Sequence, residues 1–151
     1  ALMLDSVNFP SWMLASVIFF VGAGLSLATG TSWGTFAVII PIVVTTAFAL
    51  DAPVAVCLGA ALSGGLFGDH TSPISDTTVL SSMASGVNHI SHVETQFPYA
   101  MITATLSFVG FMLASLLAQG SSAMPYVPVL IMAGMAGIAY FLLSRSRLAV
   151  L

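Results

Sequence analysis

Charge is what this sequence has least of. Of its 151 residues, 2 are basic (Lys or Arg) and 5 are acidic (Asp or Glu). Charged residues thus make up 5% of the chain, and hydrophobic residues make up 58%. Soluble domains carry roughly 25% charged residues, and the composition therefore indicates a membrane protein. The two basic residues, Arg145 and Arg147, are too few for electrostatic binding of nucleic acid. The single cysteine, Cys57, lies in an apolar run, where we expect it to pack as a small apolar side chain.

We do not expect the opening residues to be a signal peptide, because they contain no positively charged n-region. It begins ALMLD and ends RLAVL, and we expect it to be the C-terminal piece of a longer transporter, with a single membrane domain over 1–151. The sequence contains neither an internal repeat nor a low-complexity linker.

Apolar runs make up most of the chain, and they predict an all-α, polytopic membrane protein. Each of the last two runs has about 19 residues, which as a helix is about 28 Å long and spans a bilayer core. We expect these two to be continuous transmembrane helices, over about 99–118 and 126–144. The earlier runs cover about 11–28, 35–50 and 53–67.

The uncharged string TGTSWGT, Thr29 to Thr35, joins the first two runs. It is either an extramembrane loop between two full spans or the tip of a re-entrant hairpin, in which glycine allows the tight reversal. The lack of charge at the tip favours a re-entrant helical hairpin over about 11–50. Its hydroxyl residues Thr31, Ser32 and Thr35 either satisfy helix ends or line a binding site, and both readings stay open.

The polar stretch GDHTSPISD, Gly68 to Asp76, interrupts the third run. Pro73 removes a backbone donor and disfavours a helical Ser72, so we expect one broken transmembrane helix over about 52–86, with its break at 68–75. Small residues at a spacing of four precede the break, and they let helices approach closely in lipid. They form two series: Ala55, Gly59 and Ser63, and Ala60, Gly64 and Gly68.

The positions of Arg145 and Arg147, just after the last run, predict a cytoplasmic C-terminus. Counting back along the chain, 119–125 lies outside, a cytoplasmic loop covers about 87–98, and the hairpin enters the membrane from outside.

Two carboxylates fall at membrane depth, where desolvation of a charge costs several kcal/mol unless it is neutralised. No Lys or Arg lies near Asp69 or Asp76, so the partner of each comes from a longer chain or is a proton or small cation. Na⁺ is a hard cation, and hydroxyls with backbone carbonyls complete its oxygen shell. Asp76 has an alternative role as a helix N-cap. The predicted Na⁺ site consists of Asp69 and Asp76 with Ser72, Ser75 and Thr77.

Histidines lie beside and beyond this stretch. His70 is a candidate proton shuttle or pH sensor, or else a hydrogen-bonded polar neighbour of the site. His89 and His92 have the spacing of metal ligands near Glu94, but no fourth ligand is in view, and a solvated loop is the favoured interpretation.

Three blocks of the sequence carry a family resemblance: GTSWGTFAVIIPI (30–42), FGDHTSPISDTTVLSS (67–82) and NHISHVETQFPYA (88–100). They resemble the NhaC family of sodium–proton antiporters. The resemblance implies an ion-transporter-type fold built from inverted repeats, with hairpins, broken helices and alternating access. Two residues depart from the family pattern: Thr71 stands where Cys is common, and Glu94 stands where a basic residue is common.

The leading functional hypothesis is secondary active Na⁺/H⁺ antiport, in which the two ions compete at membrane-embedded aspartates. The alternative is Na⁺- or H⁺-coupled exchange of an organic acid such as malate and lactate, which relatives of this family perform. It would need a cationic or amide-rich group facing the site. We do not expect an enzyme: Gly65 to Asp69 matches the GxxGD signature of intramembrane aspartyl proteases, but Asp76 lies in the same segment and not on a facing helix.

The expected partners are Na⁺, H⁺, the lipid bilayer and the remainder of the transporter chain, with a homodimer left open and nucleic acid excluded. No cofactor is expected. The expected location is the plasma membrane of a bacterium, as a multi-pass protein.

Overall fold

The computed structural model describes residues 9–118 and 126–148. No strand occurs in these two ranges, which confirms the all-α prediction. The elements are a short 3₁₀-helix, η1 (Ser11–Met13), and the α-helices α2 (Leu14–Thr29), α3 (Ser32–Ala49), α4 (Val54–Thr71), α5 (Asp76–Ala84), α6 (His89–Ala118) and α7 (Val127–Leu148).

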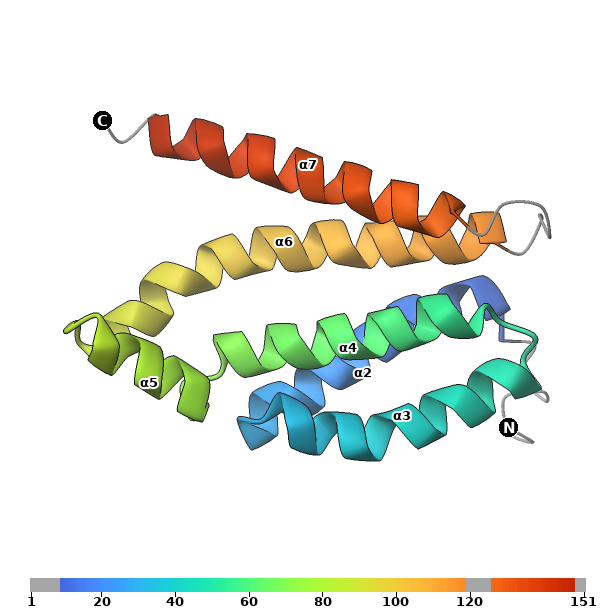
Figure 1. Ribbon diagram of the computed structural model, residues 1–151, viewed down its shortest axis with the longest axis horizontal. Helices are drawn as coiled ribbons and strands as arrows, with labels where there is room; N and C mark the ends of the chain where they lie inside the picture. Colours follow the sequence, from blue (N-terminus) through green and yellow to red (C-terminus); the bar gives the residue numbers. More distant parts are fainter. Residues whose placement is uncertain (1–8, 119–125, 149–151) are drawn as a thin grey trace.

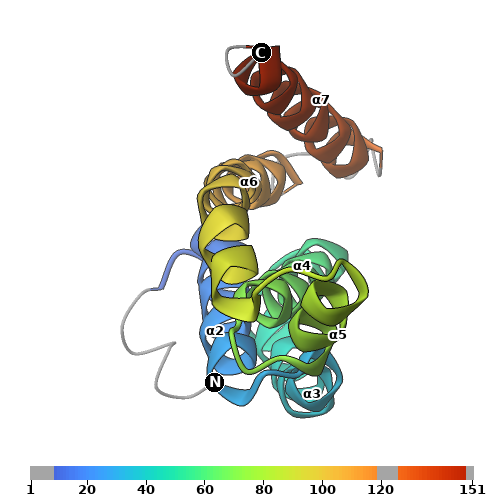
Figure 2. The same cartoon turned by 90° about the vertical axis from the view of Figure 1, so that its left-hand side faces the viewer.

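The helices α2, α3 and α4 pack as one group, and α6 lies between this group and α7 (Figures 1 and 2). The short helix α5 lies at one end of the bundle, offset from the axis of α4, and leads into α6 (Figure 1). The turn between α2 and α3 reaches the same end, beside the connection between α4 and α5 (Figure 1).

Glycines on α4 allow its close contact with α2. A Cβ atom at Gly64 would lie 3.0 Å from the carbonyl carbon of Phe19, and one at Gly68 would lie 2.7 Å from the backbone nitrogen of Leu27. Backbone therefore meets backbone at these two positions, as the predicted spacing of small residues requires. Next to this contact the Phe19 ring packs against the ring of Phe111, at a centroid distance of 5.9 Å.

The turn between α2 and α3 contains two residues. Gly30 closes α2 with φ 68°, in the left-handed region that glycine adopts without strain, and its N–H donates to the carbonyl of Ser26 at 2.8 Å. Thr31 then caps α3, since its hydroxyl accepts from the N–H of Gly34 at 3.4 Å. Helix resumes at Ser32, so the interruption is shorter than the string 29–35 that was expected to form the tip.

The interruption between α4 and α5 is also shorter than predicted. Residues 68–71 belong to α4, and only 72–75 are non-helical. Pro73 explains the boundary, because it disfavours a helical conformation at Ser72 but not at earlier residues. Ser72 accordingly has extended backbone angles, φ −74° and ψ 128°.

Three of the described helical segments are long and apolar enough to cross a membrane: 11–29, 32–49 and 89–118. A shorter apolar stretch in α7 covers 129–142. Since 11–29 and 32–49 each have sufficient length, the choice between a re-entrant hairpin and two full spans stays a prediction, and so does the orientation.

The connection expected as a loop over about 87–98 is instead helical from His89 onward. Asn88 starts the helix, because its side-chain oxygen accepts from the N–H groups of Ile90 at 3.0 Å and Ser91 at 3.3 Å. Between His89 and Phe97 there is neither glycine nor proline to end it. The expected loop conformation was therefore wrong, while the cytoplasmic placement of this segment stays a prediction.

Candidate functional site

Asp69 is the one buried carboxylate among the residues that the structure describes. It lies in the last turn of α4 and is 3% exposed. Its Oδ2 accepts a hydrogen bond from the hydroxyl of Ser32 at 3.1 Å, and its Oδ1 accepts one from Ser75 at 2.6 Å. Ser32 begins α3 and Ser75 immediately precedes α5, so both helix interruptions contribute to this one carboxylate.

Two further contacts hold the interruptions together. The Ser72 hydroxyl donates to the carbonyl of Leu27 in α2 at 2.8 Å. A Cβ atom at Gly30 would lie 2.9 Å from the carbonyl oxygen of Ile74, so only glycine fits there without displacement. The two polar breaks therefore lie against each other, and the lack of a side chain at Gly30 allows this contact.

A chain of hydroxyls leads from the buried carboxylate to the surface. The Ser75 hydroxyl bonds Asp69 and also lies 2.7 Å from the hydroxyl of Thr77, which is exposed. Ser75 itself is 0% exposed. Thr77 therefore reaches the predicted site through Ser75 and not by a direct bond to Asp69.

Asp76 is exposed and lies in the first turn of α5. Its Oδ1 accepts from the N–H of Thr77 at 2.9 Å. A carboxylate at this position satisfies a free donor and interacts favourably with the helix dipole. Among the described residues, Asp69 and Asp76 have no hydrogen-bond partner in common. The same part of the chain contains no group of three His, Cys, Asp or Glu side chains that could hold a metal ion.

His70 follows Asp69 but its ring is exposed and turned toward its own helix. Its Nδ1 lies 2.9 Å from the carbonyl of Leu66. Its backbone carbonyl accepts from Gln96 of α6 at 3.0 Å and from Thr78 of α5 at 3.3 Å. The backbone of His70, and not its imidazole, thus joins α4 to the two later helices.

The other two hydroxyl residues of the predicted tip, Thr31 and Thr35, make hydrogen bonds at the start of α3. Thr31 caps α3, as described above, and the Thr35 hydroxyl donates to the carbonyl of Thr31 at 2.9 Å. Thr35 is 3% exposed. Of the three tip hydroxyls, only Ser32 bonds the carboxylate.

Sequence reasoning missed Ser26. Its hydroxyl is buried in α2 and has no hydrogen-bond partner in the described structure, while its Cβ would lie 2.9 Å from a Cβ added at Gly68. This buried hydroxyl without a partner lies beside the residue that precedes Asp69, and its oxygen is free to accept or donate a hydrogen bond. A sequence signal for this position was present. Gly22, Ser26 and Gly30 follow one another at intervals of four residues, as the small residues of α4 do.

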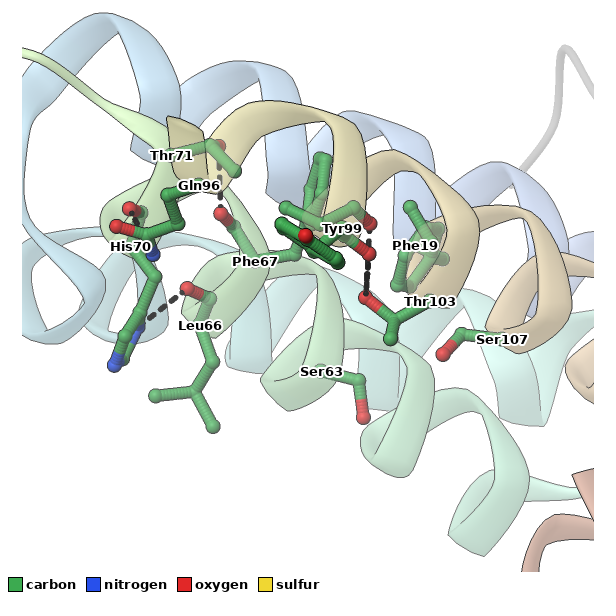
Figure 3. Close-up of a pocket in the computed structure, with 12 residues that line it drawn as sticks. Phe19, Ser63, Leu66, Phe67, His70, Thr71, Gln96, Tyr99, Thr103 and Ser107 are labelled. Atoms are coloured by element: carbon green, nitrogen blue, oxygen red, sulfur yellow. Dashed lines mark hydrogen bonds between the residues drawn. The ribbon is translucent and has the colours of Figure 1, made fainter. Parts of the chain in front are cut away.

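A cavity of about 490 Å³ lies on another side of α4, between α2, α4 and α6. Figure 3 shows Gln96, Tyr99 and Thr103 of α6 across from Phe67 and Thr71 of α4. No carboxylate, Lys or Arg is among its lining residues. Its lining mixes aromatic rings with hydroxyl and amide groups, which suits a small organic molecule better than a bare ion.

Comparison with known proteins assigns the family. The family model described as "Na+/H+ antiporter family" matches residues 3–116. The chain belongs to the Na⁺/H⁺ antiporter family. Its members are transporters and not enzymes, and the matched region includes both helix interruptions and Asp69.

Relatives within the family differ in what their names say they transport. An uncharacterized Na⁺/H⁺ antiporter of Haemophilus influenzae is 38% identical over 66% of this chain and 22% of its own length. The malate-2H⁺/Na⁺-lactate antiporter of Bacillus subtilis is 39% identical over 72% of the chain and 24% of its own length. The arginine/ornithine antiporter ArcD of Halobacterium salinarum is 35% identical, with 70% and 21% covered. The chain thus spans about a quarter of the length of these relatives. No solved structure matches it significantly.

Proposed function

We propose that this chain carries the ion site of a Na⁺/H⁺ antiporter and that Asp69 binds either ion. The observation that supports this most directly is a buried carboxylate whose two oxygens, among the described residues, are bonded only by hydroxyls. The only Lys or Arg residues of the chain are Arg145 and Arg147, near the end of α7. A buried carboxylate is neutralised by a proton, by a metal cation or by a basic group of a longer chain, and the hydroxyl partners of Asp69 favour the first two.

Competition at one carboxylate is sufficient for exchange. A proton neutralises Asp69, and so does Na⁺, but the carboxylate cannot hold both in the same place. Hydroxyl donors stabilise the ionised form, which must exist before a cation binds. When Na⁺ enters, the hydroxyls turn their oxygen lone pairs toward it, since Ser and Thr both donate and accept.

The oxygen shell that we infer for Na⁺ draws on both interruptions. Unpaired carbonyls at helix ends and hydroxyls are the ligands that hard cations and broken-helix transporters use. The proposed ligand groups are Asp69, Ser32, Ser72, Ser75 and Ser26. Thr77 and Ser75 offer a hydrogen-bonded route for protons between Asp69 and the surface. Asp76 precedes Thr77 in the chain, and His70 follows Asp69. We propose that both act near the proton route and that neither is the centre of the Na⁺ site.

The membrane arrangement that fits this site is a re-entrant hairpin formed by α2 and α3, whose tip meets the break of a helix formed by α4 and α5. Non-helical backbone at membrane depth is tolerated where it is buried in protein, and Ser72 and Ser75 are both 0% exposed. Alternating access would move this unit relative to the rest of the transporter, with α6 and α7 as continuous spans and the C-terminus in the cytoplasm.

The test is Asp69→Asn in the natural full-length protein, reconstituted in proteoliposomes. The amide keeps the size and hydrogen bonding of the carboxylate but binds neither a proton nor a cation, so Na⁺-driven proton movement should be lost. Asp51→Asn is the matched control. Asp51 is exposed and has φ 49°, a conformation that Asn also adopts, so transport should persist. Full transport by Asp69→Asn would move the ion site to another residue.

A second candidate function is coupled exchange of an organic acid. The name of the Bacillus subtilis relative and the cavity in Figure 3, whose mainly apolar lining includes hydroxyl and amide groups, support it. The Gln96 amide at this cavity is a hydrogen-bond donor of the kind that a substrate carboxylate needs, although it donates to His70 here. Exchange of labelled malate and lactate in the same proteoliposomes distinguishes the two functions.

A further inference from the structure

The first turns of α6 bond the polar connection between α4 and α5 at two places. The side-chain amide of Gln96 donates to the carbonyl of His70 at 3.0 Å, and Figure 3 shows the two residues side by side. His89, the first residue of α6, has its Nε2 2.6 Å from the carbonyl oxygen of Pro73. One contact therefore holds the end of α4, and the other holds the 72–75 connection.

Neither contact of the His89 ring depends on its charge. A carbonyl oxygen only accepts, so the contact with Pro73 places a hydrogen on Nε2. The other ring nitrogen, Nδ1, lies 3.1 Å from the hydroxyl of Ser82 in α5, which can either donate to it or accept from it. The neutral ring with its hydrogen on Nε2 therefore keeps both contacts.

Helix α5 adds a contact of the same kind. The hydroxyl of Thr78 is buried and donates to two carbonyls of the last turn of α4, that of Asp69 at 3.4 Å and that of His70 at 3.3 Å. Side chains of α5 and α6 thus hold backbone carbonyls on both sides of Ser72. The main chain that carries the buried carboxylate is fixed from outside α4.

Hydrogen bonds within the 72–75 connection are long. The N–H of Ser75 lies 3.4 Å from the carbonyl of Ser72, and the N–H of Ile74 lies 3.4 Å from the Ser72 hydroxyl. Both distances exceed the usual upper value of about 3.2 Å. Ser72 anchors one end of the connection on α2, and the 2.6 Å contact with His89 anchors its middle on α6. The position of Ser75 therefore depends on where α6 begins.

We propose that His89 and Gln96 are positioning residues of the ion site, which hold the connection so that Ser75 stays bonded to Asp69. The proposal rests on the proposed role of Asp69, because the effect on Na⁺ runs through the 2.6 Å bond from Ser75 to that carboxylate. Ligands that are ordered before the ion arrives bind it more tightly, since binding then costs less conformational entropy. This gives a role to the sequence block 88–100, which contains both positioning residues.

The first test measures binding of radioactive sodium to the purified natural full-length protein at one fixed pH. Gln96→Leu removes the amide donor at similar size, and the Na⁺ dissociation constant should rise about fivefold, the effect of one neutral hydrogen bond. His92→Gln, in the same block of α6, is the control. The His92 ring has no hydrogen bond among the described residues, so sodium affinity should stay within about twofold.

Two amide variants of His89 separate a positioning role from a purely structural one. The amide nitrogen of Gln reaches about as far as Nε2 of the ring, and that of Asn about as far as Nδ1. His89→Gln should therefore keep the bond to Pro73 and most of the sodium affinity, whereas His89→Asn should lose that bond and weaken sodium binding about fivefold. The thermal unfolding midpoint without Na⁺ should be similar in the two variants, because each keeps one of the two contacts.

The second test measures the distance between α5 and α6 by paired spin labels at the exposed positions Leu80 and Thr95, introduced as Leu80→Cys and Thr95→Cys. Cys57 is buried and stays unlabelled. Gln96→Leu and His89→Asn should each broaden the distance distribution, and His92→Gln should leave it unchanged.

Unchanged sodium affinity in both Gln96→Leu and His89→Asn would overturn this proposal, and so would equal affinities in the two His89 variants. A lower unfolding midpoint with unchanged affinity has the same consequence, because it shows a structural role alone. The label distances are independent of the ion site. If Asp69→Asn still binds Na⁺, the proposed function fails, while the label distances still decide whether His89 and Gln96 hold the connection.

Discussion

The contact between α2 and α4 at Gly68 gives a sharp prediction for Gly68→Ala. The new methyl group would lie 2.7 Å from the backbone nitrogen of Leu27 and 2.9 Å from the Cβ of Ser26. The carbonyl oxygen of Ala23 lies nearer still, and backbone cannot rotate away as a side chain does, so α2 must move by roughly 1 Å to restore ordinary contact. The same movement stretches the 2.8 Å bond from Ser72 to Leu27 toward the limit of a hydrogen bond.

Overpacking of this kind costs about 1–3 kcal/mol, and a shift of the break disturbs the ligands of Asp69 as well. We expect Gly68→Ala to lower the thermal unfolding midpoint of the purified protein and to reduce Na⁺-driven proton flux at least about tenfold. Gly59→Ala is the control on the same helix, because its methyl group would meet only the Phe111 ring at an ordinary 3.6 Å. Normal stability and flux in Gly68→Ala would refute the idea that close packing of α2 and α4 positions the site.

Two other substitutions separate structural from ion-binding roles. Asp76→Asn should reduce flux far less than Asp69→Asn, by under about tenfold, because the amide oxygen can still accept from Thr77; complete loss of flux would make Asp76 an ion carrier. Gly30→Ala should destabilise the protein by about 1–2 kcal/mol more than Gly86→Ala. Both glycines have positive φ, at 68° and 66°, but only Gly30 faces a neighbour, Ile74; equal thermal shifts would contradict the contact.

The sequence predicts the parts of this structure that depend on local chemistry. Pro73 predicts an interruption, and the uncharged glycine-containing string around Gly30 predicts a turn. The spacing of Gly64 and Gly68 predicts a close helix contact, which α2 makes. Asp69 lies one turn after Gly65, where an added Cβ would meet the Phe36 ring of α3, and it is buried on this side of α4.

Other features depend on which segments meet in space, and local patterns carry no such information. Polarity around His89 and His92 predicted a solvated loop, whereas Asn88 starts a helix there and the His89 ring finds Pro73, 16 residues away. Asp76 has the same chemistry as Asp69 in the sequence, but the 72–75 connection leaves it exposed on α5. The choice of Ser32 over Thr31 and Thr35 as the partner of Asp69 likewise depends on the direction in which α3 leaves its turn.

The central claim is that Na⁺ and H⁺ compete for Asp69, and binding of radioactive sodium to the purified full-length protein tests it most directly. Because each proton bound displaces one cation, the Na⁺ dissociation constant should rise toward tenfold for each unit by which pH falls within the competitive range. Asp69→Asn should remove both the high-affinity binding and its pH dependence, while Asp51→Asn should keep both. Sodium affinity that is independent of pH, or that persists with its pH dependence in Asp69→Asn, would contradict the account.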